Sequence, residues 1–361
     1  MIEQERPHPP GWAARATAAL SQACGQVRVI ACNTPSNLRA ELHRLEAAWA
    51  TTGAAAPHFV YEPASSSAPL QRALEGLAMD LAARGELGEL YAARAREIAD
   101  DAALCEAAGG PGLWAAARTR YARRDAFDAQ ADAEARGWLD EGPEHNPGGE
   151  DERVRSDDQG SPWSLVRRMR EEIGRGRLPL RVVVMDNLAS LAATGEGFVQ
   201  VIAGRPLTRR DVERTVLHEI AGHVEPRLRA LTPALGLFTL GTARGADDQE
   251  GRALWLEKSA GFLDAGRRRE IAWRHAAARS VEEQADFVAT ARLLLEHAAP
   301  LATALRIAAR VHRGGGLGRE AVYLPALLRV EAAMVRDHAI DEVLRVGRVA
   351  VDAASVLRAW V

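Results

Sequence analysis

Residues 215–223 carry two histidines and a glutamate in the order T-V-L-H-E-I-A-G-H. The apolar residues of this segment recur at helical spacing, so we expect it to form a helix. A hydrolytic zinc site needs imidazole and carboxylate ligands, together with a nearby glutamate that accepts a proton from water. The candidates from this segment are therefore His218 and His223 as metal ligands and Glu219 as the general base.

The two histidines are one residue further apart than in the common H-E-x-x-H zinc helix. On a regular α-helix, a step of five residues rotates a side chain by about 140° net, so the two rings would diverge. A widened π-turn with i to i+5 hydrogen bonds would return both rings to one face, and Gly222 tolerates such a distortion. The alternative is an amphipathic helix with two unrelated histidines.

An acidic block at 247–251 reads D-D-Q-E-G. We expect a helix to begin at Asp247 or Asp248, with Glu250 in its first turn as the third candidate ligand. An acidic residue in that turn would also suit the helix dipole without any metal. Glu257, two turns later on the same face, is expected either to hold a ring N–H of a ligand histidine or to be a solvated helix residue.

The H-E-I-A-G-H segment and the later Q-E-G-R-A at 249–253 resemble the HExxxH metallopeptidases. That family includes the tubulin tyrosine carboxypeptidases and bacterial relatives named for a QEGLA motif. Its two histidines and the glutamate of the second motif bind zinc, and the glutamate after the first histidine is the base. The resemblance thus implies one Zn²⁺ per chain held by His218, His223 and Glu250, with Glu219 as base.

A third block, at 310–324, resembles the basic, glycine-rich segment of the family that ends in Tyr-Leu. Weaker similarity lies at 33–37 and 58–61, so the resemblance extends over most of the chain. Two departures stand out: Arg252 replaces the Leu of QEGLA, and L-G-R-E at 317–320 replaces a Phe-Thr-Lys-Asp run. These changes leave the metal ligands intact and leave the identity of the substrate open.

The third block supplies candidate substrate contacts. A tetrahedral oxyanion needs a hydrogen-bond donor besides the metal, and Tyr323 is the candidate. A carboxypeptidase must also bind the terminal carboxylate of its substrate. Arg313, which lies among glycines, is the first candidate for this bidentate contact, and Arg319 is the second. The alternative for both arginines is ordinary surface charge, since Lys258 is the only lysine in the chain.

Strands are expected at 180–185 and 197–203, and a short one at 27–31, from their β-branched and apolar runs. Thr208 and Asp211 resemble a capping box at the start of the metal helix. In many zinc peptidases the strand before this helix pairs with the substrate backbone. We expect residues 197–203 to offer an edge to an extended peptide, the alternative being a strand that is fully paired within its sheet.

Composition indicates a cytoplasmic protein. The net charge of −3 argues against a nucleic-acid-binding surface. Three cysteines without metal-ligand spacing, Cys24, Cys32 and Cys105, suit a reducing compartment. No apolar run approaches the length of a membrane span, and no signal peptide is evident. Neither a nucleic acid nor a membrane is therefore an expected partner.

The predicted fold class is α+β and mostly helical, with a zincin-like catalytic domain whose small sheet lies beside the metal helix. The expected division is a disordered tail at 1–10, an N-terminal helical region at 11–140, a flexible linker or loop at 141–162, and the catalytic domain at 163–361. The linker prediction rests on its acidic, Gly- and Pro-rich composition.

The predicted function is that of a zinc metallopeptidase, a carboxypeptidase that acts on the C-terminus of a peptide or protein. One alternative is a zinc amide hydrolase that acts on a small peptide-like amide or a biosynthetic intermediate. Another is a non-catalytic regulatory protein on the same fold. Retention of Glu219 favours an enzyme, because a purely structural zinc site has no use for an uncoordinated base.

Overall fold

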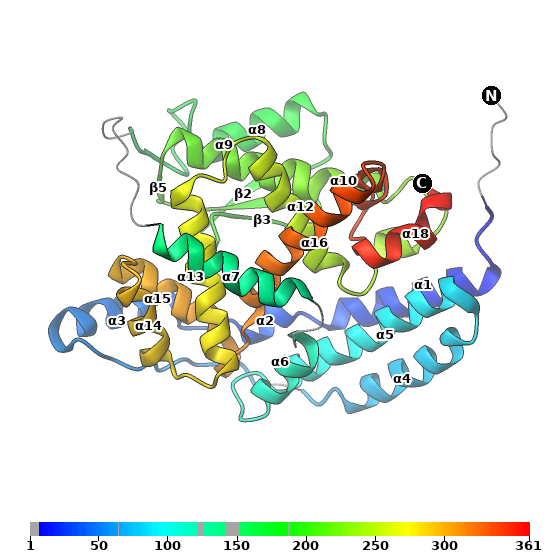
Figure 1. The fold of residues 1–361 in the computed structure, drawn as a ribbon, viewed down its shortest axis with the longest axis horizontal. Helices are drawn as coiled ribbons and strands as arrows, with labels where there is room; N and C mark the ends of the chain where they lie inside the picture. The colour runs from blue at the N-terminus through cyan, green and yellow to red at the C-terminus, as the bar shows by residue number, and fades with distance from the viewer. Residues whose placement is uncertain (1–6, 64, 122–125, 142–151, 187, 189) are drawn as a thin grey trace.

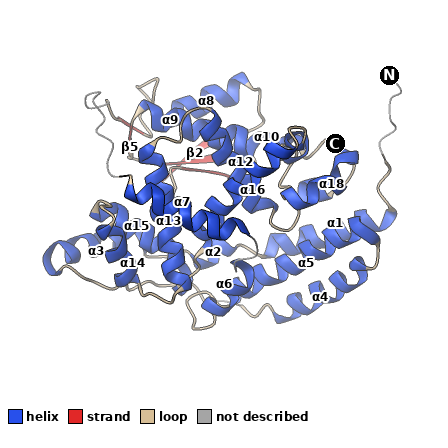
Figure 2. Ribbon diagram, in the orientation of Figure 1, coloured by secondary structure: helices blue, strands red, loops and turns tan. Residues whose placement is uncertain are grey.

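The computed structural model describes residues 7–63, 65–121, 126–141, 152–186, 188 and 190–361. Helices account for 66% of the structure, and the strands form two small sheets (Figure 2). The predicted mostly helical α+β class is therefore confirmed. Within the described residues, no helix is both long and apolar enough to cross a membrane.

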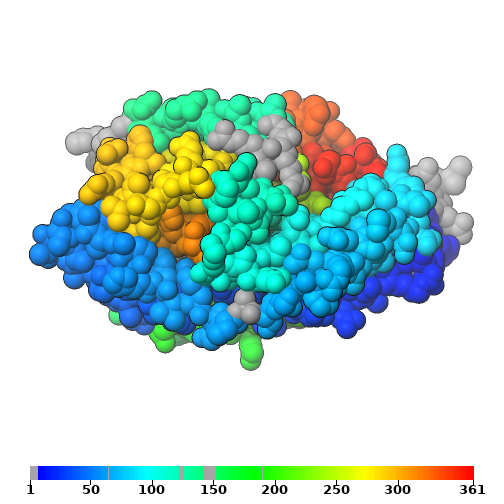
Figure 3. Space-filling model, turned by 90° about the horizontal axis from the view of Figure 1, so that it is seen from below, coloured from blue at the N-terminus to red at the C-terminus, as the bar shows by residue number. Residues whose placement is uncertain are grey.

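The N-terminal helices pack onto the C-terminal end of the chain. Buried residues of α1, α4 and α5 share one hydrophobic core with residues from α11 and α16 to α18. In Figure 3 the N-terminal part of the chain as a whole, blue to cyan, extends across the width of the face shown. The N-terminal helices are α1 (Gly11–Gln26), α2 (Val29–Asn33), α3 (Leu38–Thr52), α4 (Ala68–Ala82), α5 (Gly85–Glu106), α6 (Leu113–Tyr121) and α7 (Ala126–Asp140).

The short strand predicted at 27–31 is wrong, because helix α2 occupies Val29–Asn33. The side chain of Asn33 is fully buried, and its Nδ2 donates to the carbonyls of Val29 at 2.9 Å and of Leu104 at 3.4 Å. The second of these bonds joins α2 to α5. A tertiary contact has thus overridden the β-branched local sequence.

Among the remaining helices, α8 and α9 lie beside the larger sheet, and α18 lies near the C-terminus (Figure 1). In chain order they are α8 (Leu165–Arg175), α9 (Arg209–Leu217), the π-helix η1 (His218–Val224), α10 (Glu225–Arg229), α11 (Leu237–Leu240), α12 (Gly245–Ser259), α13 (Ala265–Glu282), α14 (Phe287–Glu296), α15 (Leu301–Val311), η2 (Arg313–Gly315), η3 (Arg319–Val322), α16 (Tyr323–Arg336), α17 (Ile340–Leu344), η4 (Val351–Ala353), α18 (Ala354–Leu357) and η5 (Arg358–Trp360).

The larger sheet has the order β2-β4-β3, with β2 (Arg181–Met185) parallel to β4 (Phe198–Ile202) and β3 (Ala192–Thr194) antiparallel to it. Val199 and Val201 of β4 are buried in one cluster with residues of α8, α9 and η1. Alternate side chains of a strand share a face, so this face of β4 supports α9 and η1, the helix that carries both histidines. The predicted strands at 180–185 and 197–203 are present as β2 and β4.

The expectation that residues 197–203 offer a free edge is wrong, because β4 lies between two partners. The chain folds back from β3 to β4 through a tight turn at Glu196 and Gly197, where Gly197 has a φ of +71°. Glycine adopts this conformation without strain. The outer strand on this side of the sheet is β3, which also contacts η1.

The expected tail and linker are described only in part. Residues 1–6 of the tail and 142–151 of the linker lie outside the described residues. Beyond that gap, β1 (Val154–Arg155) pairs with β5 (Pro206–Leu207) in the second, two-stranded sheet. The hydroxyl of Ser156 is buried and donates to the carbonyl of Ile202 at 2.5 Å. Residues 154–156 are therefore attached to the body of the protein.

Helix α12 lies between η1 and α16, and two glycines allow this close packing. A Cβ on Gly222 of η1 would lie 2.7 Å from the Cβ of Ala253 on α12. A Cβ on Gly251, on the α16 side, would overlap the backbone of Ala326. Neither position has room for a side chain, so the separation of the three helices depends on both glycines.

The substitution Gly251→Ala should destabilise the metal-free protein by about 1–3 kcal/mol, because the added methyl overpacks the contact with α16. Chemical denaturation measures this change. Gly76→Ala, inside α4 with open space around it, is the matched control. The control should be neutral or stabilising by up to about 1 kcal/mol, since alanine favours helix. Equal effects of the two substitutions would contradict the packing argument.

Candidate metal centre

The helix that carries the two histidines begins and widens as the sequence predicts. Thr208 and Asp211 form the predicted capping box, in which each side chain accepts a hydrogen bond from the backbone N–H of the other residue. Helix α9 then passes into the π-helix η1, and the N–H of Glu225 bonds to the carbonyl of Ile220, five residues back. The predicted π-turn is confirmed.

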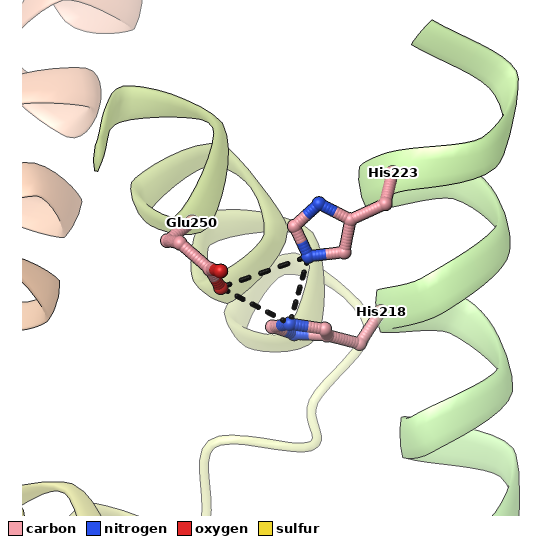
Figure 4. A group of neighbouring side chains, drawn as sticks. All are labelled: His218, His223 and Glu250. Carbon is pink, nitrogen blue, oxygen red and sulfur yellow. Dashed lines mark hydrogen bonds and ion pairs between the residues drawn. The ribbon is translucent and has the colours of Figure 1, made fainter. Parts of the chain in front are cut away.

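The widened turn brings the two histidines together. Their Nε2 atoms are 3.2 Å apart, and Oε2 of Glu250 lies 3.5 Å from that of His218 and 3.6 Å from that of His223. Figure 4 shows both rings leaving one helix and meeting Glu250, which comes from the facing helix α12. Among the described residues, these three form the group that could hold a metal ion.

The spacing of these donor atoms fits a tetrahedral metal. With metal–ligand bonds of about 2.0–2.1 Å, two ligand atoms of a tetrahedral site lie about 3.3 Å apart. The observed separations of 3.2, 3.5 and 3.6 Å are close to that value. Two imidazoles and one carboxylate also form a donor set that suits zinc.

Each histidine ring is held at its other nitrogen. Nδ1 of His218 lies 2.7 Å from Oε1 of Glu257, and Nδ1 of His223 lies 3.1 Å from Oε1 of Gln249. Such contacts fix the ring orientation and the tautomer of a ligand histidine. The contact expected of Glu257 is therefore present. That of Gln249 was not anticipated, although Gln249 stands beside Glu250 in the second motif.

Buried carboxylates surround the histidines. Burial opposes a charge on His218, but hydrogen bonds to Glu250 and Glu257 raise its pKa to about 10. Burial would raise the pKa of Glu250, yet His223 and His218 lower it well below its ordinary value. Burial would also raise the pKa of Glu257, but Arg267 and His218 outweigh this effect and lower the pKa to about 2. The carboxylates thus stay ionised, and a metal cation would replace the protons on the histidines.

The candidate base, Glu219, is buried next to the first histidine. Its Oε2 accepts a hydrogen bond from Oγ1 of Thr194, at 2.8 Å. Thr194 ends β3, so the outer strand of the sheet holds one oxygen of this carboxylate. This contact was not predicted, because a three-residue strand with two alanines has no recognisable pattern in the sequence.

The two N-terminal segments that resemble the family meet at the third block. The side chain of Asn37 bonds to the backbone of His58 and of Val60, which joins 33–37 to 58–61. Gly314 has a φ of +65°, and a Cβ there would collide with Asn33. Burial raises the pKa of Tyr61, which lies near Gly314, to about 12. Segments far apart in sequence therefore support the glycine-rich block.

Tyr323 is buried at the start of α16. Its hydroxyl oxygen accepts a hydrogen bond from Nη2 of Arg310 at 3.4 Å, and the guanidinium of Arg274 lies 4.3 Å from the ring centroid. Burial raises the pKa of Tyr323, and the negative charge of Glu250 adds to the effect. The phenol therefore stays protonated near the candidate ligand.

The two candidate arginines of the third block differ in their surroundings. Arg313 is only 6% exposed, its Nε has no partner among the described residues, and burial lowers its pKa to about 10. The alternative that Arg313 is an ordinary surface charge is therefore excluded. Burial also opposes the charge on Arg319, but Tyr323, Tyr121 and Glu250 outweigh it and raise its pKa. The guanidinium of Arg319 makes no hydrogen bond or ion pair with another described residue.

A paired-helix centre of two histidines and a glutamate, with a second glutamate at hand, is the type of site found in peptidases. A family model described as microtubule-associated tyrosine carboxypeptidase matches residues 49–361, and the chain belongs to this family. Membership confirms the resemblance seen in the sequence and supports an enzyme of the carboxypeptidase type. A comparison with curated proteins returned no match.

A buried histidine precedes Arg313 in the third block. Nε2 of His312 lies 2.8 Å from Oγ1 of Thr290, which lies 2.8 Å from the hydroxyl of Ser280. Burial lowers the pKa of His312 from 6.5 to about 4. The folded protein therefore keeps this ring neutral at pH values where the unfolded chain protonates it.

His312 should make the metal-free protein less stable as the pH falls from 6.5 to 4. Its contribution is complete above pH 6.5, and up to about 3 kcal/mol is lost as the pH approaches 4, because only the unfolded state gains the proton. Denaturant unfolding across this range should give a shallower pH dependence for His312→Asn than for the parent protein. If the free energy of unfolding depended on pH equally in both proteins, the lowered pKa would not belong to His312.

Proposed function

We propose that the protein is a zinc-dependent carboxypeptidase, with one Zn²⁺ held by His218, His223 and Glu250. The observation that carries the proposal is the set of three donor atoms at tetrahedral spacing, from rings whose outer nitrogens are anchored. When bound, zinc in such a site lowers the pKa of water to about 7 and polarises a carbonyl.

Two side chains are proposed to handle protons and charge. Glu219 accepts the proton of the attacking water and passes it to the leaving amine. Thr194 holds one carboxylate oxygen of Glu219 and leaves the other for this exchange. Tyr323 donates its hydroxyl hydrogen to the carbonyl oxygen as negative charge develops there. The bond from Arg310 supports this role, because an oxygen that accepts retains its own hydrogen to donate.

The terminal carboxylate of the substrate is assigned to Arg319. This guanidinium has no other partner among the described residues, and the charges acting on it include that of Glu250. A planar guanidinium binds a carboxylate through two parallel hydrogen bonds. This reverses the order expected from the sequence: Arg313, the first candidate there, becomes the second, although its buried Nε is also unpaired among the described residues.

The outer edge of β3 is proposed to bind the substrate backbone, in place of the strand first expected. The N–H of Gly195 bonds to Phe198 on β4, so the alternate residue Thr194 directs its own N–H and C=O toward the outer edge. An extended peptide added at Thr194 would lie beside Glu219.

The substrate is proposed to be the C-terminus of a peptide or protein. The alternative of a small peptide-like amide stays open, because the third block departs from the family at 317–320. A regulatory role without turnover is disfavoured by the buried, hydrogen-bonded Glu219. A cytoplasmic location stays a prediction from composition.

Two substitutions test the metal and the base separately. His218→Ala should abolish binding of zinc, measured by metal analysis of the purified protein, because it removes one of three ligands. Glu219→Gln should retain zinc and lower hydrolysis of a peptide library by at least about 100-fold, since general acid–base catalysis typically contributes that much. Metal-free wild-type protein, or unchanged turnover in Glu219→Gln, would refute the respective assignment.

Arg319→Ala should lower kcat/KM for peptides with a free C-terminus by about 10- to 100-fold, the effect of losing a charge-assisted bond. Amidated peptides of the same sequence should be affected far less. The matched variant Arg313→Ala distinguishes the two arginines, because it removes a second unpaired guanidinium from the same block. A selective loss in Arg313→Ala alone would move the carboxylate contact to that residue.

A further inference from the structure

Arg252 is the residue at which the second motif departs from its relatives, and it is buried. Only 6% of it is exposed, on α12, two positions after Glu250. Its Nε donates to Oδ1 of Asp341 at 2.7 Å, and its Nη1 donates to the backbone carbonyl of Ala221 at 3.1 Å. Ala221 lies inside the π-turn, between the two histidines. Arg252 thus contacts the very turn that brings the ligands together.

The carbonyl of Ala221 lacks a donor within its own helix. In a π-turn each carbonyl accepts from the N–H five residues ahead, as Ile220 does from Glu225. In this register the donor for Ala221 would be residue 226, which is a proline and has no N–H. A buried carbonyl without a partner is costly, so the turn needs a donor from elsewhere.

We propose that Arg252 is a positioning residue that stabilises the π-turn by supplying the hydrogen bond that Pro226 cannot give. The guanidinium reaches Ala221 from α12, while Asp341 on α17 fixes its orientation. The contact of Gly222 with Ala253 holds the two helices close enough for this reach. Arg252 thereby acts on the metal centre through the backbone between His218 and His223, without touching either ring.

The competing explanation is a purely structural ion pair. Arg252 and Asp341 join α12 to α17, and removing either partner would leave the other unpaired. Such a pair would affect folding stability but not the shape of the turn. The two explanations differ in one respect: only the positioning role can be replaced by an N–H at residue 226.

A double-mutant cycle separates the two explanations. Arg252→Leu, which restores the residue of the motif, should weaken Zn²⁺ affinity by about 10- to 100-fold, as the loss of supporting contacts around metal ligands does. Competition with a chromophoric chelator measures this affinity. Pro226→Ala in the same chain provides the missing N–H and should restore affinity to within about 3-fold of the Pro226→Ala protein. Absence of rescue would overturn the proposal.

Asp341→Asn is the control, because it removes the charge of the ion pair while its amide Oδ1 can still accept from Nε of Arg252 and keep the guanidinium oriented. It should change Zn²⁺ affinity by less than about 3-fold. Equal losses of affinity in Asp341→Asn and Arg252→Leu, without rescue, would assign Arg252 to the ion pair alone. If Arg252→Leu does not fold, Arg252→Met retains the apolar stem and takes its place in the cycle.

The role of Arg252 rests on the proposed function only in taking the two histidines as ligands. A second measurement distinguishes a failure of this role from a failure of the proposed function. In the metal-free protein, hydrogen exchange of the backbone amides at 223–225 should be at least about 10-fold faster in Arg252→Leu, and Pro226→Ala should slow it again. Wild-type protein that binds no Zn²⁺ would refute the proposed function. Unchanged exchange would refute the role of Arg252.

Discussion

The close approach of α12 to η1, the helix that carries both histidines, is the constraint on which the rest of the candidate site depends. Two residues with no side chain at the contact, Gly222 and Gly251, allow α12 to pack between η1 and α16. From that position α12 supplies the carboxylate that faces both histidines, and it also supplies Gln249 and Glu257, which hold the outer ring nitrogens. The π-turn brings the two histidine rings together, and α12 provides the side chains that these rings contact.

The second feature of the site is a series of buried charged side chains, each of which contacts the next. His218 contacts Glu257, Glu257 accepts two hydrogen bonds from Arg267, and Arg267 also pairs with Glu270. Buried ions are tolerated when each has a partner, so such a chain fixes the ring of a ligand without leaving a charge isolated. Asp248 on the same helix pairs with Arg329 of α16, which ties the position of α12 to α16 by charge as well as by packing.

The parts of the site that the sequence predicted are those encoded by local spacing. The capping box, the widened turn and the contact of Glu257 each follow from the positions of a few residues along one or two helices. The contact between Thr194 and Glu219 could not be predicted in this way, because Thr194 lies in a three-residue strand that no motif or periodic pattern of the sequence indicates. The same holds for β3 itself: its pairing, and not its composition, makes it a strand.

The third block shows how burial alters a prediction made from residue types. Arg313 was expected either to bind the substrate carboxylate or to be ordinary surface charge, yet it is buried, and the next residue, Gly314, accepts a hydrogen bond from the backbone of Gly109. Glu320 accepts hydrogen bonds from Arg274 and Arg310. Burial would raise its pKa, but the two arginines outweigh this effect and lower the pKa to about 2. Asp247, which lies near Arg319, forms an ion pair with Arg120, with 3.6 Å between Oδ2 of Asp247 and Nη1 of Arg120.

Two guanidinium charges, those of Arg313 and Arg319, therefore remain without an anionic partner among the described residues. Guanidinium donors without a hydrogen-bond partner are unfavourable away from solvent, and an anionic ligand would satisfy them. A free C-terminal carboxylate is such an anion, and it is the group that distinguishes the substrates of a carboxypeptidase from internal peptide bonds. The electrostatic imbalance of the third block thus favours the same substrate class as the family to which the chain belongs.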